Sequence, residues 1–215
     1  MILPRLYPIV DLGAFASAAD PVLAASRFVE ALIHGGATIL QLRDKGTDVR
    51  RFLTCARELR RITRDRAQLI INDRADLALA SQADGVHLGQ DDLPPSAIRP
   101  IFDAATIGDP NRHLSIGFST HSPDQVRLAD SMLVDYIAIG PVFATSSKAN
   151  PDPVVGLEGV LQARQATTKP LVAIGGITRS NCLQVREAGA DSVAVISDLL
   201  ESPVKAVEEF LSILG

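Results

Sequence analysis

Charged and hydroxyl side chains in this sequence gather in short clusters, and each cluster comes after a short apolar run. The clusters are Gln41–Lys45, Asn72–Arg74, Gly89–Asp92, Ser119–His121 and Thr145–Lys148, and the later apolar runs end at Gly175–Gly176 and Ile196–Ser197. Lysine and arginine suit phosphate oxygens, and aspartate is a ligand that Mg²⁺ accepts beside phosphate oxygens and water. The pattern indicates ionic chemistry on a phosphorylated ligand that is bound with a metal ion.

Three cations and two carboxylates carry this interpretation. Arg43, Lys45 and Lys148 are the candidate phosphate-binding cations, and Asp73 and Asp92 are the candidate Mg²⁺ ligands. The alternative is a rim of surface ion pairs with no ligand. The repeated coincidence of polar clusters with the ends of apolar runs favours the ligand site.

The apolar runs themselves predict strands. They are short, several are rich in Val and Ile, and they lack polar alternation, which is typical of parallel strands buried on both faces. The predicted strands are 6–10, 38–42, 68–71, 85–88, 114–118, 136–139, 171–174 and 192–196.

Amphipathic stretches of helical length lie between these runs. Asp20, Ser122 and Ser202 each precede a proline, which predicts helix N-termini there. Gly35 and Gly189 are predicted as the left-handed residues that close helices. Residues 106–113 are predicted to form a polar loop before the fifth strand.

Eight strand–helix units in 215 residues fit a single-domain (β/α)₈ TIM barrel that spans residues 1–215. A doubly wound open sheet is the alternative, but its glycine-rich dinucleotide fingerprint is missing after the first strand. The active site of a barrel lies at the carboxyl ends of its strands, where the polar clusters fall. A Gly-Gly pair after the seventh strand is in the place where barrels often bind phosphate.

Composition excludes several classes of protein. The formal net charge of −4 argues against a nucleic-acid partner. The seven arginines of residues 50–66 are predicted to form a solvated helix face. No apolar run is long enough to span a membrane, and the N-terminus lacks a convincing signal peptide. Cys55 and Cys182 are predicted to be buried thiols, so we expect a cytoplasmic protein, with self-association left open.

The four histidines are expected to lie in different environments. His87 lies inside a predicted strand and is expected to be a packed or hydrogen-bonded barrel residue. His121 follows the fifth strand, where helix capping and ligand contact are both open interpretations. His34 and His113 are expected to be exposed.

The ordered set of motifs resembles the thiamine phosphate synthase family over nearly the whole chain. The matching stretches are QLRDK at 41–45, INDR at 71–74, GVHLGQDDL at 85–93, GFSTHS at 117–122, IGPVFATSSK at 139–148, AIGGI at 173–177 and AVIS at 194–197. Each stretch alone is a weak signal, but the set is specific. Asp44 stands where the family commonly has Glu, and Ser147 where it more usually has Thr.

The resemblance implies a Mg²⁺-dependent transferase that couples 4-amino-2-methyl-5-hydroxymethylpyrimidine diphosphate with a thiazole phosphate and releases pyrophosphate. Contacts to the pyrimidine diphosphate would come from Gln41, Leu42, Arg43, Asp44, Lys45, Asn72, Ser119 and Lys148. The thiazole phosphate would contact Thr145, Ser146, Ser147, Gly176, Ile196 and Ser197. Asp73 and Asp92 would bind Mg²⁺. Within this set, Arg43, Lys45, Ser119 and Lys148 would act in catalysis.

A dissociative substitution suits these residues. Mg²⁺ and the cations would stabilise the leaving pyrophosphate, and no strong protein nucleophile is required. The alternatives are a related thiazole tautomerase, with His121 as its acid/base, a non-catalytic binder of thiamine precursors, and a generic sugar-phosphate barrel enzyme. Retention of QLRDK, Asp73, Asp92 and Lys148 favours the synthase.

Overall fold

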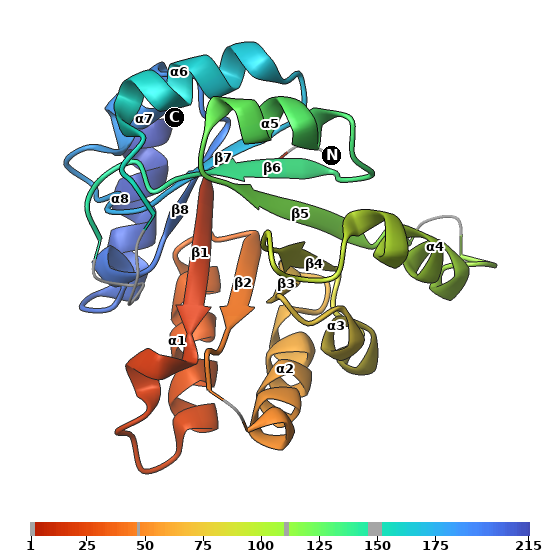
Figure 1. Cartoon of the computed structure of the whole chain (residues 1–215). Coiled ribbons are helices and arrows are strands. Elements are labelled where there is room, and N and C mark those ends of the chain that lie inside the picture. The colour runs from red at the N-terminus through yellow and green to blue at the C-terminus, as the bar shows by residue number, and fades with distance from the viewer. Residues whose placement is uncertain (1–2, 47, 110–111, 146–151) are drawn as a thin grey trace.

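The strands of this protein close into a single ring. The computed structural model describes residues 3–46, 48–109, 112–145 and 152–215. In these residues eight strands follow one another around a closed barrel in chain order, and every neighbouring pair is parallel, including β1 with β8 (Figure 1). The predicted (β/α)₈ TIM barrel is confirmed, and closure of the ring excludes the doubly wound open sheet.

All eight predicted runs are strands. They are β1 (Leu6–Asp11), β2 (Ile39–Arg43), β3 (Gln68–Asn72), β4 (Gly85–Leu88), β5 (Ser115–Thr120), β6 (Tyr136–Ile139), β7 (Leu171–Ile174) and β8 (Ser192–Val195). Four of them, β1, β2, β3 and β5, end one or two residues later than predicted. Arg43, Asn72 and Ser119 therefore belong to rigid strands and not to the loops that follow them.

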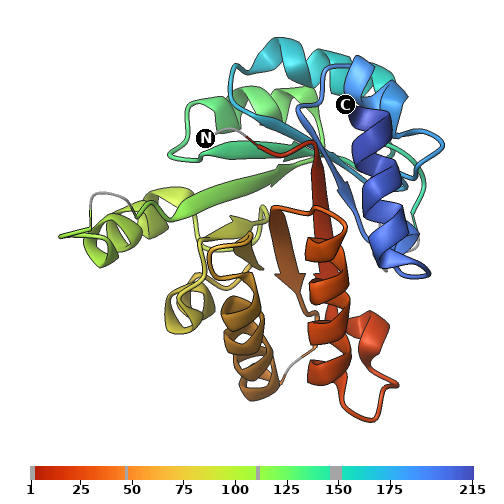
Figure 2. The same ribbon diagram turned by 180° about the vertical axis from the view of Figure 1, so that it is seen from behind.

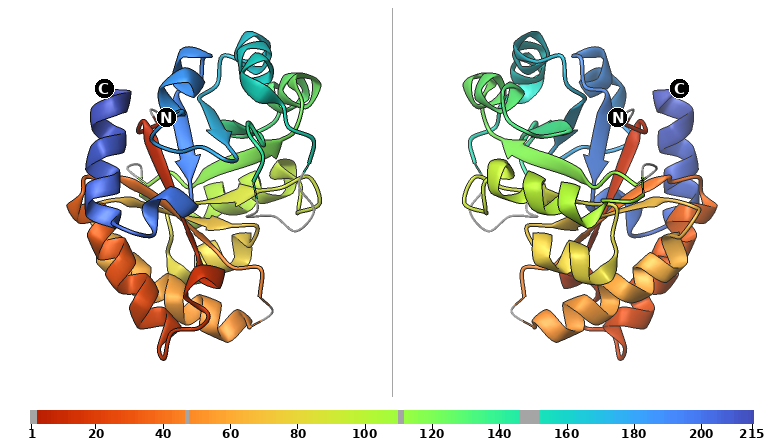
Figure 3. Two further views of the ribbon diagram at one scale, coloured as in Figure 1. Left: turned by 90° about the vertical axis from the view of Figure 1, so that its left-hand side faces the viewer. Right: turned by 90° about the vertical axis from the view of Figure 1, so that its right-hand side faces the viewer.

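The helices form a layer outside the strands, as the views from behind and from both sides show (Figures 2 and 3). They are α1 (Pro21–His34), α2 (Val49–Thr63), α3 (Ala75–Ser81), α4 (Pro95–Ala105), α5 (Pro123–Asp130), α6 (Gly156–Ala166), α7 (Cys182–Glu187) and α8 (Pro203–Leu214), with the 3₁₀ helices η1 (Leu12–Phe15) and η2 (Ser197–Leu199). α4 ends at Ala105, so the described residues of the predicted 106–113 loop lie outside helices and strands as expected.

The predicted helix starts are confirmed, and one predicted helix end is wrong. The side chains of Asp20 and Ser122 accept the expected capping hydrogen bonds, from Leu23 N–H and Gln125 N–H. Ser202 is the N-cap residue of α8 but makes no such bond.

At the C-terminal ends, Gly189 is left-handed as predicted, with φ of 114°. Gly35 is right-handed, with φ of −71°, and Gly36 takes the left-handed position instead, with φ of 106°. Gly35 is still required for space, because a Cβ there would lie 2.7 Å from the Val204 carbonyl oxygen of α8.

Alternation along the strands creates two separate cores. Side chains such as Leu6, Val10 and Leu42 point outward and pack in the larger core beneath the helices. Side chains such as Tyr7 and Tyr136 point inward and belong to the smaller core inside the barrel. An aliphatic and tyrosine floor therefore closes the barrel below the ends where the polar clusters lie.

The remaining sequence predictions concern the helices. Cys55 on α2 and Cys182 on α7 are buried free thiols, as expected, and burial raises the pKa of Cys55 to about 12. The arginines of α2 and of the turn that follows it are exposed or half-buried, and four of them form ion pairs, with Asp44, Asp84, Glu58 and Glu30. Among the described residues, no helix is both long enough and apolar enough to cross a membrane.

Candidate active site

Five of the predicted ligand residues line one groove at the carboxyl ends of β2, β3 and β4. The groove has a volume of about 290 Å³, and its walls include Asp44, Lys45, Asn72, Asp73 and Asp92. These residues come from three separate sequence clusters, at 41–45, 72–74 and 89–92. The barrel therefore brings together side chains that the sequence places up to 48 residues apart (44 to 92).

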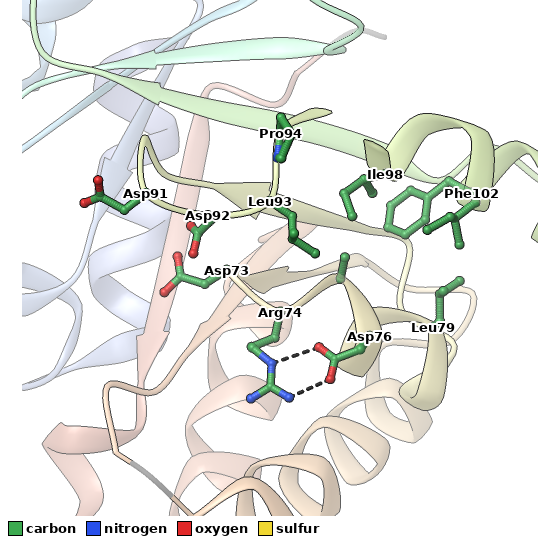
Figure 4. Close-up of a pocket in the computed structure, with 12 residues that line it drawn as sticks. Asp73, Arg74, Asp76, Leu79, Asp91, Asp92, Leu93, Pro94, Ile98 and Phe102 are labelled. Atoms are coloured by element: carbon green, nitrogen blue, oxygen red, sulfur yellow. Dashed lines mark hydrogen bonds and ion pairs between the residues drawn. The ribbon is translucent and has the colours of Figure 1, made fainter. Parts of the chain in front are cut away.

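Two carboxylates and one ammonium group meet in this groove. Lys45 Nζ lies 2.6 Å from Asp73 Oδ2, and Figure 4 shows the carboxyl groups of Asp73 and Asp92 next to each other. Asp92 also accepts a 2.6 Å hydrogen bond from Gly89 N–H, which holds the turn after β4. Asp91, the neighbouring carboxylate, is exposed and points away from the pair (Figure 4).

The backbone at Asp73 is unusual. Its φ is 63°, in the left-handed region that aspartate and asparagine tolerate better than most residues. Asp73 N–H donates a 2.7 Å hydrogen bond to the His87 carbonyl, which fixes this conformation between β3 and β4. The strand end is thereby shaped to direct the Asp73 carboxylate toward Asp92.

The carboxylate pair is suited to a divalent cation. Burial, with the nearby Asp73 charge adding to it, raises the pKa of Asp92 above its usual range. The Lys45 ammonium group offsets part of the repulsion between the Asp73 and Asp92 carboxylates. In the described residues, no group of three or more His, Cys, Asp and Glu side chains could hold a metal ion. Two carboxylates are what Mg²⁺ commonly takes from a protein when phosphate oxygens and water supply its other ligands, so the residues fit that ion.

A second, more apolar groove adjoins the first, between α3 and α4. Its volume is about 530 Å³, and it shares Asp73 and Asp92 with the smaller groove. Leu79, Ile98 and Phe102 form its far wall (Figure 4). Arg74 closes its lower side through a two-pronged ion pair with Asp76.

Arg43 and Asp44, neighbours in sequence, point to different partners. Arg43 forms an ion pair with Asp11 at the end of β1, so one side of its guanidinium is fixed and its other N–H groups remain available. The Asp44 side chain, 7% exposed, accepts hydrogen bonds from Gly46 N–H and Arg51 at 2.7 and 3.1 Å. Asp44 therefore ties the loop after β2 to the start of α2.

The other predicted residues of the pyrimidine site lie deeper. Gln41 is 4% exposed and points into the barrel, where its Nε2 donates to Tyr7 Oη at 3.4 Å. Leu42 points outward into the core beneath the helices, so only its backbone is left for a ligand. Ser119 Oγ lies 2.8 Å from His87 Nε2.

The four histidines lie in different surroundings. His87 is 7% exposed and hydrogen-bonded inside the barrel, as predicted, and His34 and His113 are exposed. His121 Nδ1 donates to the Gly140 carbonyl at 2.7 Å and lies 3.5 Å from Asp152 Oδ2. Its imidazole therefore ties the loops after β5 and β6 together.

The predicted phosphate-binding residues lie across the barrel mouth on the loops after β6, β7 and β8. Gly176 has φ of 62°, and a Cβ there would lie 2.6 Å from the Ala144 carbonyl oxygen, so glycine allows these loops to approach closely. Thr145 follows Ala144, and Ile196 and Ser197 begin η2 after β8. Ser146, Ser147 and Lys148 lie outside the described residues.

Sequence reasoning missed a clamp on this side of the mouth. The Arg179 guanidinium donates to both carboxyl oxygens of Asp198, at 3.1 and 3.2 Å, and to Glu209 at 2.5 Å. The Arg179 backbone N–H also donates to Asp198. The clamp joins the loop after β7 to η2 and α8. Asp198, directly after the AVIS stretch, was the available signal.

Comparison with known proteins decides the family. The family model described as thiamine monophosphate synthase matches residues 6–199. The chain belongs to this family. It is 52% identical over 213 residues to a thiamine-phosphate synthase of Koribacter versatilis (strain Ellin345), covering 99% of this chain and 96% of the relative. It is 40% identical to a thiamine-phosphate synthase of Vibrio campbellii (strain ATCC BAA-1116), covering 96% of each.

The fold comparison agrees. The structure of thiamine phosphate pyrophosphorylase from Pyrococcus furiosus superposes with a TM-score of 0.81 at 34% identity, covering 98% of this chain and 95% of that one. The resemblance found in the sequence motifs is therefore confirmed. The activity of the chain is thiamine-phosphate synthesis, a transferase reaction of thiamine biosynthesis. This favours the synthase over the tautomerase, binder and sugar-phosphate alternatives.

Proposed function

We propose that the 290 Å³ groove binds the diphosphate of 4-amino-2-methyl-5-hydroxymethylpyrimidine diphosphate together with Mg²⁺, and that residues 1–215 act as one catalytic domain. The observation that carries this proposal is the meeting of Asp73 and Asp92 with Lys45 in one groove. Mg²⁺ held by these carboxylates would neutralise charge on the leaving pyrophosphate. We also propose a cytoplasmic location, which suits two buried free thiols.

The chain's own residues would position the diphosphate and stabilise its charge. Lys45 is 59% exposed, so its ammonium group can reorient from Asp73 toward phosphate oxygens in the same groove. Arg43 is less free, because Asp11 fixes it, and it presents its remaining N–H groups in a defined direction. Gln41, Asn72 and Ser119 would contact the pyrimidine from the inner wall of the barrel.

The reaction proposed is a dissociative substitution. The bond between the pyrimidine methylene carbon and the diphosphate oxygen breaks, and pyrophosphate leaves with the electron pair. The thiazole nitrogen then donates its lone pair to the electron-poor methylene, which forms the new carbon–nitrogen bond. No serine, threonine or cysteine is among the described residues that line the groove, in keeping with a site that positions charges.

The thiazole phosphate is proposed to bind across the mouth, at Thr145, Gly176, Ile196 and Ser197. The close approach of the loops after β6 and β7 supports this, because it leaves their backbone groups beside one another. Ser146, Ser147 and Lys148 stay predictions for the same ligands.

The direct test is pyrophosphate release by the purified protein. Release is expected only with both substrates and Mg²⁺ present, with one thiamine phosphate formed for each pyrophosphate. EDTA should stop the reaction, and added Mg²⁺ should restore it. Turnover that continues unchanged in EDTA would contradict the metal site, and pyrophosphate released without thiamine phosphate would contradict the coupling.

Weakening the Arg179 clamp is expected to raise KM for the thiazole phosphate and to leave KM for the pyrimidine diphosphate unchanged. Arg179→Gln removes three hydrogen bonds from the guanidinium to Asp198 and Glu209. The loop after β7 would keep the backbone N–H hydrogen bond to Asp198 but lose the side-chain links to η2 and α8, so its position would be less fixed and KM for the thiazole phosphate should rise about tenfold. KM for the pyrimidine diphosphate should stay near its normal value, because that groove lies on the other side of the mouth.

Arg127→Gln is the matched control for the clamp. Arg127 pairs with Asp124 on the exposed face of α5, and this change removes a guanidinium without touching a loop of the mouth. Steady-state kinetics with each substrate varied in turn gives both KM values. An equal rise in both constants for Arg179→Gln, or none in either, would contradict the role of the clamp.

A further inference from the structure

A continuous hydrogen-bond chain crosses the interior of the barrel. Gln41 Nε2 lies 3.4 Å from Tyr7 Oη, which lies 2.8 Å from Tyr136 Oη. Tyr136 Oη lies 3.1 Å from His87 Nδ1, and His87 Nε2 lies 2.8 Å from Ser119 Oγ. The two ends of the chain, Gln41 and Ser119, are both proposed contacts of the pyrimidine diphosphate. The sequence motifs assigned no ligand contact and no catalytic role to the three residues between them.

The middle of this chain is cut off from water. Tyr7 is 1% exposed and Tyr136 is 0% exposed, and they lie among aliphatic side chains of the inner core. Burial raises the pKa of both tyrosines, so each hydroxyl keeps its proton. Both ring nitrogens of His87 face neutral hydroxyl groups, Tyr136 Oη and Ser119 Oγ, an arrangement that suits a neutral imidazole with one N–H. Every link is therefore a neutral hydrogen bond with one proton to place.

The donor at the Gln41 end sets the direction of all the protons. An amide Nε2 can only donate, so Tyr7 Oη accepts a hydrogen bond from Gln41. The Tyr7 hydroxyl therefore donates its own hydrogen bond to Tyr136 Oη. Tyr136 in turn donates to His87 Nδ1, which leaves the single imidazole proton on Nε2. His87 Nε2–H then donates to Ser119 Oγ. The Ser119 hydroxyl proton is not used within the chain.

The opposite direction has a different consequence at the site. With the Gln41 amide turned over, its oxygen would accept from Tyr7 and every proton in the chain would reverse. The Ser119 hydroxyl would then donate its hydrogen bond to His87 Nε2 and could offer a ligand only its lone pairs. The two directions therefore differ in one observable atom, the imidazole nitrogen that carries the proton.

We propose that Tyr7, Tyr136 and His87 are positioning residues that form a one-way hydrogen-bond relay from Gln41 to Ser119, and that this relay makes Ser119 a hydrogen-bond donor toward the pyrimidine diphosphate. The proposal rests on the proposed function in placing that substrate at Ser119. The relay acts by orientation, so no proton is transferred along it. A ligand atom with a free lone pair is the partner that the Ser119 hydroxyl is set to recognise.

The first test reads the imidazole directly and needs no variant enzyme. In ¹⁵N-labelled protein at neutral pH, the two ring nitrogens of His87 give different chemical shifts for the protonated and the bare position. The relay predicts the proton on Nε2. A proton on Nδ1, or a doubly protonated ring, would overturn the proposed direction whatever the enzyme's activity.

Tyrosine-to-phenylalanine variants at the two ends of the pair form a matched set. Tyr136→Phe keeps the ring but removes the donor to His87 Nδ1, so the preference for the Nε2 proton should weaken and kcat should fall about tenfold. Tyr7→Phe leaves the contact between Tyr136 and His87 in place but cuts the link from Gln41, so the preference for the Nε2 proton should weaken in this variant as well. A His87 ¹⁵N spectrum in Tyr7→Phe that is the same as in the unmodified protein would overturn the directing role of Gln41 and with it the relay.

A double-mutant cycle separates failure of the relay from failure of the proposed site. Ser119→Ala should lower kcat/KM for the pyrimidine diphosphate, and adding Tyr136→Phe to it should cause little further loss, because the relay ends at Ser119. Fully multiplicative losses would overturn the relay and leave the site standing. Normal kinetics of Ser119→Ala would overturn both, because Ser119 would then contact no reacting substrate.

Discussion

Asp92→Asn is expected to abolish Mg²⁺-dependent pyrophosphate release while the barrel remains folded. The change removes one of the two adjacent carboxylates in the groove, and with it a hard anionic ligand of the proposed Mg²⁺ site. Loss of metal-based charge stabilisation costs several kcal/mol, at least about a hundredfold in kcat. The amide oxygen of Asn can still accept the hydrogen bond from Gly89 N–H, so the turn after β4 should persist.

Asp91→Asn is the matched control for this prediction. It makes the same change of charge one residue earlier, at an exposed side chain that points away from Asp73 (Figure 4). Its activity and its Mg²⁺ dependence should be near normal. The measurement is pyrophosphate release over a Mg²⁺ titration, with circular dichroism to verify folding. A folded Asp92→Asn protein with near-normal kcat would show that Asp92 is not a ligand.

At Asp73 the choice of substitution decides whether the loss of the carboxylate charge is tested apart from the backbone conformation. Asp73 has φ of 63°, so replacement by Ala would add backbone strain to the loss of the carboxylate. Asn tolerates that conformation, and Asp73→Asn would therefore test the charge alone. It would also release Lys45 from its 2.6 Å ion pair, which makes Asp92 the cleaner position for the first experiment.

The barrel was predictable from the sequence because its signal is local and repeated. Buried parallel strands appear as short Val- and Ile-rich runs, and all eight predicted runs are strands. The prediction of helix ends was wrong where two neighbouring residues could each take the left-handed conformation. The left-handed end of α1 is Gly36 and not Gly35, because α8 packs against Gly35 and both glycines fit the local pattern.

The site was only partly predictable, because strand ends indicate which residues gather but not where each side chain points. The sequence placed Lys45, Asp73 and Asp92 together. It gave no sign that Arg43 pairs with Asp11, or that Asp44 turns toward Arg51. The link between Tyr7 and Tyr136 joins residues 129 positions apart, and such pairs follow from barrel closure and inward alternation combined.

Gly117→Ala is expected to destabilise the protein severely. Gly117 is an inward-facing residue of β5, opposite Tyr136 in the register of β5 with β6. A Cβ at this position would lie 2.1 Å from Tyr136 Cζ and 2.5 Å from His87 Nδ1. Neither ring can retreat easily inside a filled barrel, so we expect a loss of about 3 kcal/mol or more in the free energy of unfolding.

Gly13→Ala gives the matching control at the barrel mouth. A Cβ there would meet Asp11 Oδ1 at 3.1 Å, the end of a side chain that can shift, so the expected cost is below about 1 kcal/mol. Urea denaturation followed by circular dichroism measures both changes as shifts in the midpoint. Equal midpoints for Gly117→Ala and the unmodified protein would mean that the space opposite Tyr136 is not needed.

The glycine at position 117 also explains how a barrel this small can contain a tyrosine pair. The missing side chain leaves room beside β6 for the Tyr136 ring, which places its hydroxyl between Tyr7 and His87. Alanine would push that ring away and break the contact to His87 as well as the packing. Gly117→Ala protein that remains folded at low temperature should therefore have a lowered kcat, as is expected of Tyr136→Phe, and normal turnover of such protein would contradict this coupling of packing to the site.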